Sequence, residues 1–333
     1  MAIRNKPNVI RDPLAVGSRA LRLVTCLLVL LAVQPLPATL SAEPLRLVRG
    51  PYLQSVTTDT ALVCWGGSAA QTGAVDYGPT VSYDSVATTV QGAVDQCVRL
   101  AGLAANTRYH YRVRAEGAPP TADASFKTAA GPEMGSIAFV AWGDNRTNHP
   151  IHRRLAGMVK DSGPDFVLNV GDLVEDGTRM GDWDAFFDIE RELMANSPVY
   201  PAIGNHELNS PLYFSLFALP GNERWYSFDS GPAHFVVMDV VFSRFDPGSE
   251  QYAWLERDLR ESTRPWKIAT FHYPAYAYSP FRSNVEAVRA NLAPLFEKYG
   301  VQLAFSGDVS SRPAVRDIRF FYRPLNQRRY LGG

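Results

Sequence analysis

The chain has 333 residues, of which 46% are hydrophobic and 20% charged, a composition typical of a globular protein long enough for two domains. Lysine plus arginine number 33, as do aspartate plus glutamate, so the formal net charge is zero. A chain without net positive charge lacks the electrostatic footprint of a nucleic-acid-binding protein, and we expect no nucleic-acid partner.

The first 42 residues have the pattern of a signal peptide. Five basic residues precede an apolar run of eleven residues, Leu23 to Val33. That length suits the hydrophobic region of a signal peptide and is too short for an ordinary membrane-spanning helix. We therefore predict cleavage near Glu43 and a secreted or periplasmic protein that is not stably inserted in a membrane. An uncleaved anchor or a buried strand is the alternative. Removing five basic and one acidic residue leaves 28 and 32, a net charge near −4.

Residues 45–129 are predicted to form an antiparallel β-sandwich. Short segments that alternate apolar and polar residues are separated by turn residues, a pattern typical of such domains. These segments are Val75–Tyr77, Cys97–Leu100, Tyr109–Val113 and Ser125–Thr128. Residues 129–134 form the linker that follows.

Cys64 and Cys97 are the cysteines that remain beyond the leader. Alternation along the predicted strand 60–65 places Ala61, Val63 and Trp65 on one face and Cys64 on the other. An oxidising compartment would permit a disulfide between the two cysteines on the exposed face of the sandwich. Two free thiols are the alternative, and the cysteines do not have a metal-binding spacing.

After the linker, apolar segments of strand length alternate with helical segments. Three of the strands end in polar motifs: 136–142 before Gly143-Asp144-Asn145-Arg146, 165–170 before Gly171-Asp172, and 198–203 before Gly204-Asn205-His206-Glu207. A fourth strand, 265–271, ends at His272. Ligands bind beyond the carboxyl ends of strands in an open sheet, so these motifs are expected to converge on one site.

The remaining periodicity predicts stacked sheets with helices on their outer faces. Apolar residues recur at helical spacing in 150–160, 183–195, 250–260 and 284–298. Residues 227–229 and 234–239 are expected to pair as strands of the second sheet.

The converging side chains are carboxylates, an amide oxygen and imidazoles. Such a mixed oxygen and nitrogen set suits Fe, Zn or Mn better than Ca or Mg alone. Two cations about 3.5 to 4 Å apart can clamp a phosphate and activate a bridging water. The sequence therefore predicts a two-metal site.

The order of these motifs resembles that of the calcineurin-like metallophosphoesterase superfamily. The region before them is similar to the fibronectin type III-like amino-terminal domain of purple acid phosphatases. The resemblance covers residues 45–308 and implies an α+β or α/β fold, in which two stacked mixed sheets flanked by helices (135–308) follow the all-β sandwich (45–129). It also implies metal ligation by Asp144, Asp172, Asn205 and His272, with Asp172 bridging both ions.

The implied activity is hydrolysis of small-molecule phosphomonoesters or phosphodiesters by a metal-bound hydroxide. In this comparison His206 contacts the substrate phosphate and protonates the leaving oxygen, a role natural to imidazole. Glu175 occupies the position of the tyrosine that colours the purple enzymes, so we expect no purple chromophore.

The end of the chain departs from the family pattern. Gly307-Asp308-Val309-Ser310 stands where the family has Gly-His-x-His. Asp308 is therefore weighed evenly between a weak metal ligand and a loop residue, and residues 309–333, rich in arginine, are interpreted as a divergent or truncated tail. The alternative function is a catalytically impaired protein of the same fold that acts as a binding or scaffold module.

Other polar residues near the motifs receive structural interpretations. Arg146 is expected in a surface salt bridge rather than on the phosphate. His149 and His152 are expected to be solvated or loosely packed, and Glu207 is expected to orient its neighbours. The aromatic residues after the third motif are assigned to the core by default, with lining of a substrate cleft as the alternative. These residues are Tyr213, Phe214, Trp225 and Tyr226.

Overall fold

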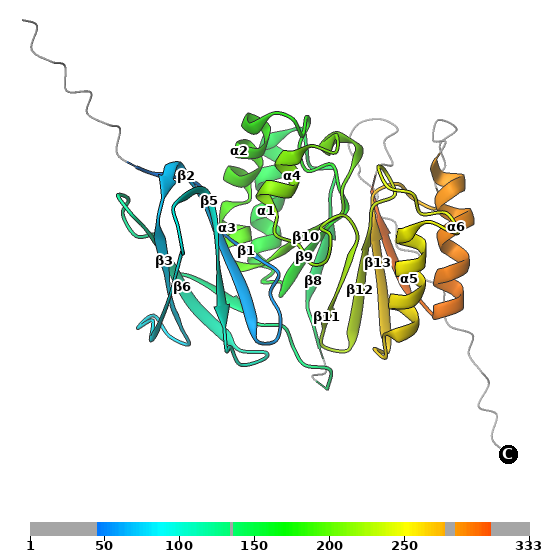
Figure 1. The fold of residues 1–333 in the computed structure, drawn as a ribbon, viewed down its shortest axis with the longest axis horizontal. Coiled ribbons are helices and arrows are strands. Elements are labelled where there is room, and N and C mark those ends of the chain that lie inside the picture. Colours follow the sequence, from blue (N-terminus) through cyan, green and yellow to red (C-terminus); the bar gives the residue numbers. More distant parts are fainter. Residues whose placement is uncertain (1–44, 134–135, 277–283, 308–333) are drawn as a thin grey trace, which may run out of the picture. The chain divides into compact units, whose positions relative to one another are not determined.

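The computed structural model describes residues 45–133, 136–276 and 284–307 (Figure 1). The predicted signal peptide, Asp308 and the tail 309–333 lie outside the described residues. Within the described ranges, no helix has both the length and the apolar character needed to cross a bilayer.

The amino-terminal part of the described chain consists of two antiparallel sheets. One has the order β1-β2-β5 and the other β4-β3-β6-β7. Their strands are β1 (Leu47–Gln54), β2 (Thr60–Gln71), β3 (Gly73–Gly78), β4 (Ser85–Thr88), β5 (Ala93–Ala101), β6 (Arg108–Ala115) and β7 (Ala124–Lys127). The facing sides of the sheets bury one cluster, which includes Val63, Trp65, Val75 and Tyr111.

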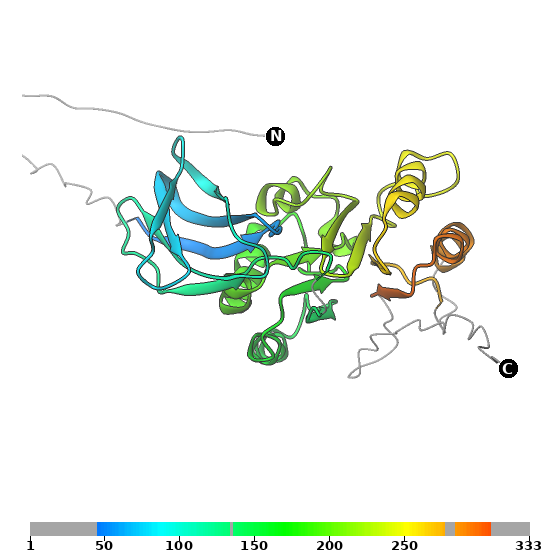
Figure 2. The same ribbon diagram turned by 90° about the horizontal axis from the view of Figure 1, so that it is seen from below.

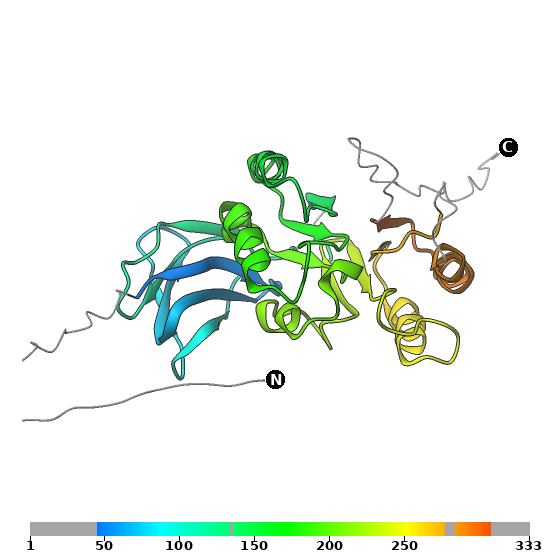
Figure 3. The ribbon, with the colours of Figure 1, turned by 90° about the horizontal axis from the view of Figure 1, so that it is seen from above.

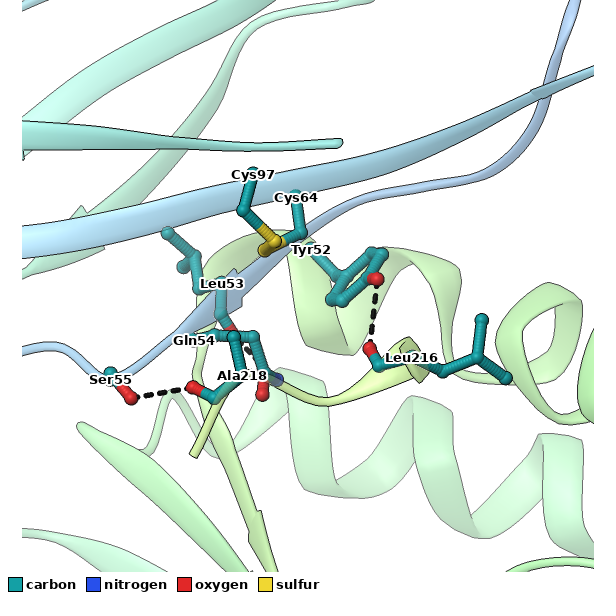
Figure 4. Close-up of a disulfide and its surroundings, with 8 residues drawn as sticks. All are labelled: Tyr52, Leu53, Gln54, Ser55, Cys64, Cys97, Leu216 and Ala218. Carbon is teal, nitrogen blue, oxygen red and sulfur yellow. Dashed lines mark hydrogen bonds between the residues drawn. A yellow bond between two sulfur atoms is a disulfide. The ribbon is translucent and has the colours of Figure 1, made fainter. Parts of the chain in front are cut away.

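A disulfide joins Cys64 and Cys97, which lie directly opposite each other on β2 and β5 (Figure 4). The bridge is therefore present, but the expectation that it lies on an exposed face is wrong for Cys64, which is fully buried. Tyr52, beside it, packs on Phe187 of helix α2 (Met180–Ile189) at a ring-centroid distance of 4.8 Å and donates a hydrogen bond to the Leu216 carbonyl. Alternation along β2 correctly placed Cys64 on the opposite face of the strand from Val63. It could not indicate that other residues of the chain cover the face that carries Cys64.

We expect removal of this disulfide to cost about 3–4 kcal/mol of unfolding free energy, because the bond closes a loop with a sequence separation of 33 residues. The variant Cys64→Ala/Cys97→Ser avoids burying a hydroxyl at position 64. Urea unfolding of the variant and of the oxidised parent would measure the difference. A loss below about 1 kcal/mol would contradict the chain-entropy estimate.

Two stacked sheets form the rest of the fold. The first is parallel with the order β10-β9-β8, and the second has the order β11-β12-β13-β14, in which only β11 is antiparallel to its neighbour. The strands are β8 (Phe139–Trp142), β9 (Phe166–Asn169), β10 (Val199–Pro201), β11 (Tyr226–Ser230), β12 (Ala233–Met238), β13 (Trp266–Phe271) and β14 (Leu303–Ser306). Phe166 packs against Phe235 between the sheets at a centroid distance of 5.0 Å.

Helices cover the outer faces of both sheets, as the sequence predicts. They are α1 (His149–Asp161), α2 (Met180–Ile189), α3 (Arg191–Asn196), α4 (Pro211–Leu216), α5 (Glu250–Glu261) and α6 (Asn284–Tyr299). Figures 2 and 3 show α5 and α6 on the outer side of the second sheet, where they bury Val236 and Met238 of β12. The single helix expected over 183–195 is instead two, α2 and α3, because the backbone leaves helical geometry at Glu190.

His234 joins the second sheet to α5. Its Nδ1 donates to Asp229 and its Nε2 to Asp258, both at 2.7 Å, so the ring carries a proton on each nitrogen. Burial alone would lower the pKa of His234, but the two carboxylates outweigh it and raise the pKa to about 9.

This raised pKa predicts a loss of stability in alkali. A histidine whose folded pKa exceeds its unfolded value stabilises the fold fully below pH 6.5 and loses that contribution as the pH rises through about 9. Allowing for solvent screening at the half-exposed Asp229, we expect about 2 kcal/mol. Urea unfolding should show wild type losing that much more than His234→Gln between pH 6 and pH 10. Parallel pH profiles for the two proteins would contradict the assignment.

Candidate metal centre

The polar motifs that follow β8, β9, β10 and β13 lie together. Asp144, Asp172 and His272 each offer a ligand atom, and these atoms lie within 4.8 Å of one another. Asn205 begins a short 3-10 helix, Asn205–Glu207, directly after β10. Its Oδ1 is 3.1 Å from Nε2 of His272. The structure therefore brings together four of the five side chains predicted as ligands, while Asp308 is outside the described residues.

The backbone at the strand ends is tightly folded. Asp144 and Asp172 have φ values of 52° and 57°, in the left-handed region that non-glycine residues rarely adopt. Both sit where a strand turns sharply into the site, and such strain concentrates at functional positions. The backbone of Gly307 passes close to the side chain of Asp144, since a Cβ at position 307 would lie 2.7 Å from Oδ2 of Asp144. A side chain at position 307 would therefore collide with a predicted ligand.

A hydrogen bond at Nδ1 fixes the orientation of the His272 ring. The ring is fully buried, and Nδ1 lies 2.8 Å from the Val170 carbonyl oxygen, which can only accept a hydrogen bond. In the neutral ring this bond fixes the tautomer and leaves the lone pair on Nε2. That atom faces Oδ1 of Asn205 and, at 3.3 Å, Oδ1 of Asp172.

This donor set fits a metal cation. Nε2 of His272 faces the Oδ1 atoms of both Asn205 and Asp172, and no proton lies between these electron-rich atoms when the imidazole is neutral. Their mutual repulsion is relieved by a cation, and an imidazole with carboxylate and amide oxygens is a set that Fe, Zn and Mn accept.

Arg146 also lies within the centre. Its Nη1 donates to Oδ2 of Asp172 at 3.0 Å and is 3.6 Å from Asp144, and its Nε is 3.4 Å from Glu175. The side chain is 23% exposed and Asp172 only 1%. The expected salt bridge is therefore present, but it lies within the centre rather than at the surface, because the tight turn after β8 directs residue 146 towards the ligands.

Glu207 connects two of the ligand loops. Its buried carboxylate accepts hydrogen bonds from the backbone N–H groups of Gly204 (2.6 Å), Asp172 (3.0 Å) and Leu173 (2.8 Å). Burial, with a further contribution from the charge of Asp172, raises the pKa of Glu207 to about 7. The expected orienting role of Glu207 is confirmed.

His206 stands at the accessible edge of the centre, with its side chain 25% exposed. Its backbone N–H donates to Oδ1 of Asp172 at 3.0 Å, and its Nδ1 donates to the Glu175 carbonyl at 2.7 Å. These two hydrogen bonds fix the position of the His206 ring and do not involve its Nε2 atom. Arg146 and Glu175 also line a neighbouring hollow of about 500 Å³, together with His149 and Arg179; His206 is not among its lining residues.

Sequence reasoning misjudged one polar group in this region. His152 is 3% exposed rather than solvated, and it contacts Asn145 and Glu190, which are also buried. Asn145 directly follows the predicted ligand Asp144, and this position in the sequence could have indicated a place near the centre. No sequence feature marks Glu190, because it lies inside a segment with helical periodicity.

The aromatic residues after the third motif divide between core and surface. Tyr213 and Tyr226 are buried and donate hydrogen bonds to the Pro201 carbonyl, so the default assignment to the core is correct for them. Trp225 lines a separate hollow beside α5, together with Trp254 and Arg257.

Comparisons with known proteins agree with this geometry. The family model described as Calcineurin-like phosphoesterase matches residues 145–311, half of the chain. Purple acid phosphatase 23 of Arabidopsis thaliana is 28% identical over an alignment of 267 residues that covers 66% of this chain and 57% of that protein. Acid phosphatase type 7 of Mus musculus is 33% identical over an alignment of 170 residues that covers 42% of this chain and 38% of the relative. The chain spans about half the length of the first curated relatives that it matches.

Two solved structures share the fold. A purple acid phosphatase from yellow lupin, PPD1, aligns with a TM-score of 0.65 and 20% identity, covering 78% of this chain and 58% of that chain. The structure of PhoD aligns with a TM-score of 0.61 and 14% identity, covering 78% and 71%. At these identities the likeness concerns the fold, two stacked sheets with flanking helices. With half of its length matched by the family model, the chain belongs to the calcineurin-like phosphoesterase family.

Proposed function

We propose that the chain is an exported, metal-dependent phosphoesterase of the acid phosphatase type, which hydrolyses phosphomonoesters or phosphodiesters of small molecules. The observation that carries this proposal is the convergence of Asp144, Asp172 and His272 within 4.8 Å at the ends of three strands. Asn205 completes the described ligand set, and Asp308 remains a candidate fifth ligand. Two ions of Fe, Zn or Mn suit these donors.

When bound, two such cations activate water and neutralise the charge that develops on the phosphoryl oxygens. The chain's own residues supply orientation. Asp172 has both carboxylate oxygens directed into the centre, as the contacts of Oδ1 with His272 and Oδ2 with Arg146 indicate. The guanidinium of Arg146 offers further donors of the fork geometry that suits phosphate oxygens.

His206 is the proposed proton donor to the leaving oxygen. The Glu175 carbonyl holds the proton on Nδ1, so the proton that is transferred belongs to Nε2. The side chain is 25% exposed and therefore accessible to a leaving oxygen. General acid catalysis by imidazole typically contributes 10²- to 10⁴-fold.

Export and domain division are parts of the same proposal. Residues 1–42 would be removed as a signal peptide, consistent with a disulfide in the chain. The fibronectin III-like sandwich, 45–129, would support the catalytic part, 135–308, without contributing chemistry.

The second candidate is a binding or scaffold module with impaired catalysis. It is favoured by one sequence observation, the replacement of Gly-His-x-His by Gly307-Asp308-Val309-Ser310. Loss of an imidazole from each metal would weaken metal binding.

Metal content and hydrolysis together decide between the two candidates. Elemental analysis of the purified chain should find two metal ions per chain, and hydrolysis of nitrophenyl phosphate or bis(nitrophenyl) phosphate should disappear in Asp172→Ala. Less than one metal ion per chain with no turnover would overturn the enzyme proposal in favour of the scaffold.

A further inference from the structure

A buried polar cluster lies behind the candidate metal centre. Asn145, His152 and Glu190 are 2%, 3% and 0% exposed. Oε1 of Glu190 accepts a hydrogen bond from Nδ2 of Asn145 at 3.0 Å and lies 2.8 Å from Nε2 of His152, and Nδ2 of Asn145 lies 2.7 Å from the same Nε2. The three residues come from the loop after β8, from α1 and from the break between α2 and α3, so no single element accounts for their meeting.

The cluster continues to the second ligand loop. Oδ1 of Asn145 accepts from Nδ2 of Asn169 at 3.2 Å, and Oδ1 of Asn169 accepts from the backbone N–H of Gly171 at 3.0 Å. The Gly171 carbonyl in turn accepts from the backbone N–H of Asp144 at 3.0 Å. This closed path begins and ends beside Asp144 and passes the residue directly before Asp172.

The burial of this polar cluster costs desolvation free energy, which an apolar cluster at the same place would not. Its surroundings are apolar, with the Trp142 and Phe186 rings at 5.5 and 6.0 Å from the His152 ring. Burial raises the pKa of Glu190, and its Oε2 has no hydrogen-bond partner among the described residues. Replacing such a buried polar group by well-packed apolar residues is often neutral or stabilising. Fold stability alone therefore does not explain why polar residues occupy these three buried positions.

We propose that Glu190, paired with His152, is a positioning residue for the metal centre: it holds the Asn145 amide, and through it sets the spacing of the loops that carry Asp144 and Asp172. The inference rests on the proposed metal-binding function. Outer hydrogen-bond partners of metal ligands typically affect metal affinity by 10- to 100-fold, which sets the expected effect.

Metal affinity tests this role directly. Titration calorimetry with Mn²⁺ should show affinity reduced about 10- to 100-fold in Glu190→Leu, which removes the acceptor. Glu190→Gln should retain affinity within about threefold, because its amide oxygen can still accept from Asn145. Glu192→Leu is the matched control, since that exposed carboxylate pairs with Lys160 and has no link to the ligand loops. Thermal unfolding of the metal-free proteins distinguishes a loss of metal affinity caused by displaced ligand loops from one caused by a destabilised fold.

The outcomes are distinguishable. Reduced affinity in Glu190→Leu with an unchanged or raised metal-free melting temperature supports the inference. Unchanged affinity overturns it and leaves the proposed function intact. If wild type binds none of Mn²⁺, Zn²⁺ and Fe²⁺ in the same titration, the proposed function itself is overturned. If Glu190→Leu does not fold, Asn145→Ser provides the same test, because it cuts the path to Asn169 and leaves the Glu190–His152 pair; normal affinity in that variant would also overturn the inference.

Discussion

Replacing Glu207 by glutamine is expected to cost about 2–4 kcal/mol of unfolding free energy and to weaken metal binding about 10- to 100-fold. Three backbone N–H groups converge on the Glu207 carboxylate, from Gly204, Asp172 and Leu173. An amide presents one NH₂ group to these donors, so at least one buried N–H loses its acceptor. The same loss allows the loops that carry Asp172 and Asn205 to separate.

Urea unfolding without metal and calorimetric titration with Mn²⁺ measure the two effects of Glu207→Gln. The matched control is Glu256→Gln, which changes a carboxylate that pairs with Lys298 on the helices of the second sheet, away from the ligand loops. Equal stability and equal metal affinity for Glu207→Gln and wild type would show that the carboxylate does not hold the loops.

Replacing His206 by alanine is expected to slow hydrolysis of alkyl phosphates by about 10²- to 10⁴-fold. An alkoxide leaves poorly without a proton, and the imidazole is the proposed donor. Nitrophenolate is a stable anion that departs without protonation, so the loss on nitrophenyl phosphate should be less than about tenfold if the ring serves mainly as a general acid.

Steady-state kinetics on the two substrate classes would measure this difference. Metal content must be checked in parallel, because the backbone N–H of His206 donates to Asp172 and a displaced loop would reduce both rates. His110→Ala, which removes a histidine of the sandwich paired with Asp123, is the control. An equal loss on both substrates, with metal content unchanged, would remove His206 from the proton-donor role.

Much of the architecture could be read from the sequence because its signals are local. Apolar segments that end in Gly-Asp or Gly-Asn-His-Glu identified β8, β9 and β10, although β8 begins at Phe139 rather than at residue 136. Helical periodicity located α1, α5 and α6 but passed over the break at Glu190, since a single non-helical residue does not disturb the spacing of its apolar neighbours.

The candidate centre shows the same division. Asp144, Asp172 and Asn205 follow parallel strands of one sheet, which end at a common edge, so their convergence was predictable. His272 follows β13 of the second sheet and joins them because the two sheets are stacked. Their role as ligands remains a prediction. Arg146 and the pair His152–Glu190 were misjudged or missed, because their contacts depend on a turn at Asp144 and on residues 38 positions apart in the chain.

The sequence by itself determined the strands that end in the polar motifs, helices α1, α5 and α6, the chemical types gathered at the strand ends and the face on which Cys64 lies, because each follows from periodicity or from a short motif. Only the tertiary structure decided what covers that face, which carboxylates are buried and which side chains hold the ligand loops in place. Burial and hydrogen bonding between distant residues arise from the packing of whole elements, and local patterns carry no information about that packing.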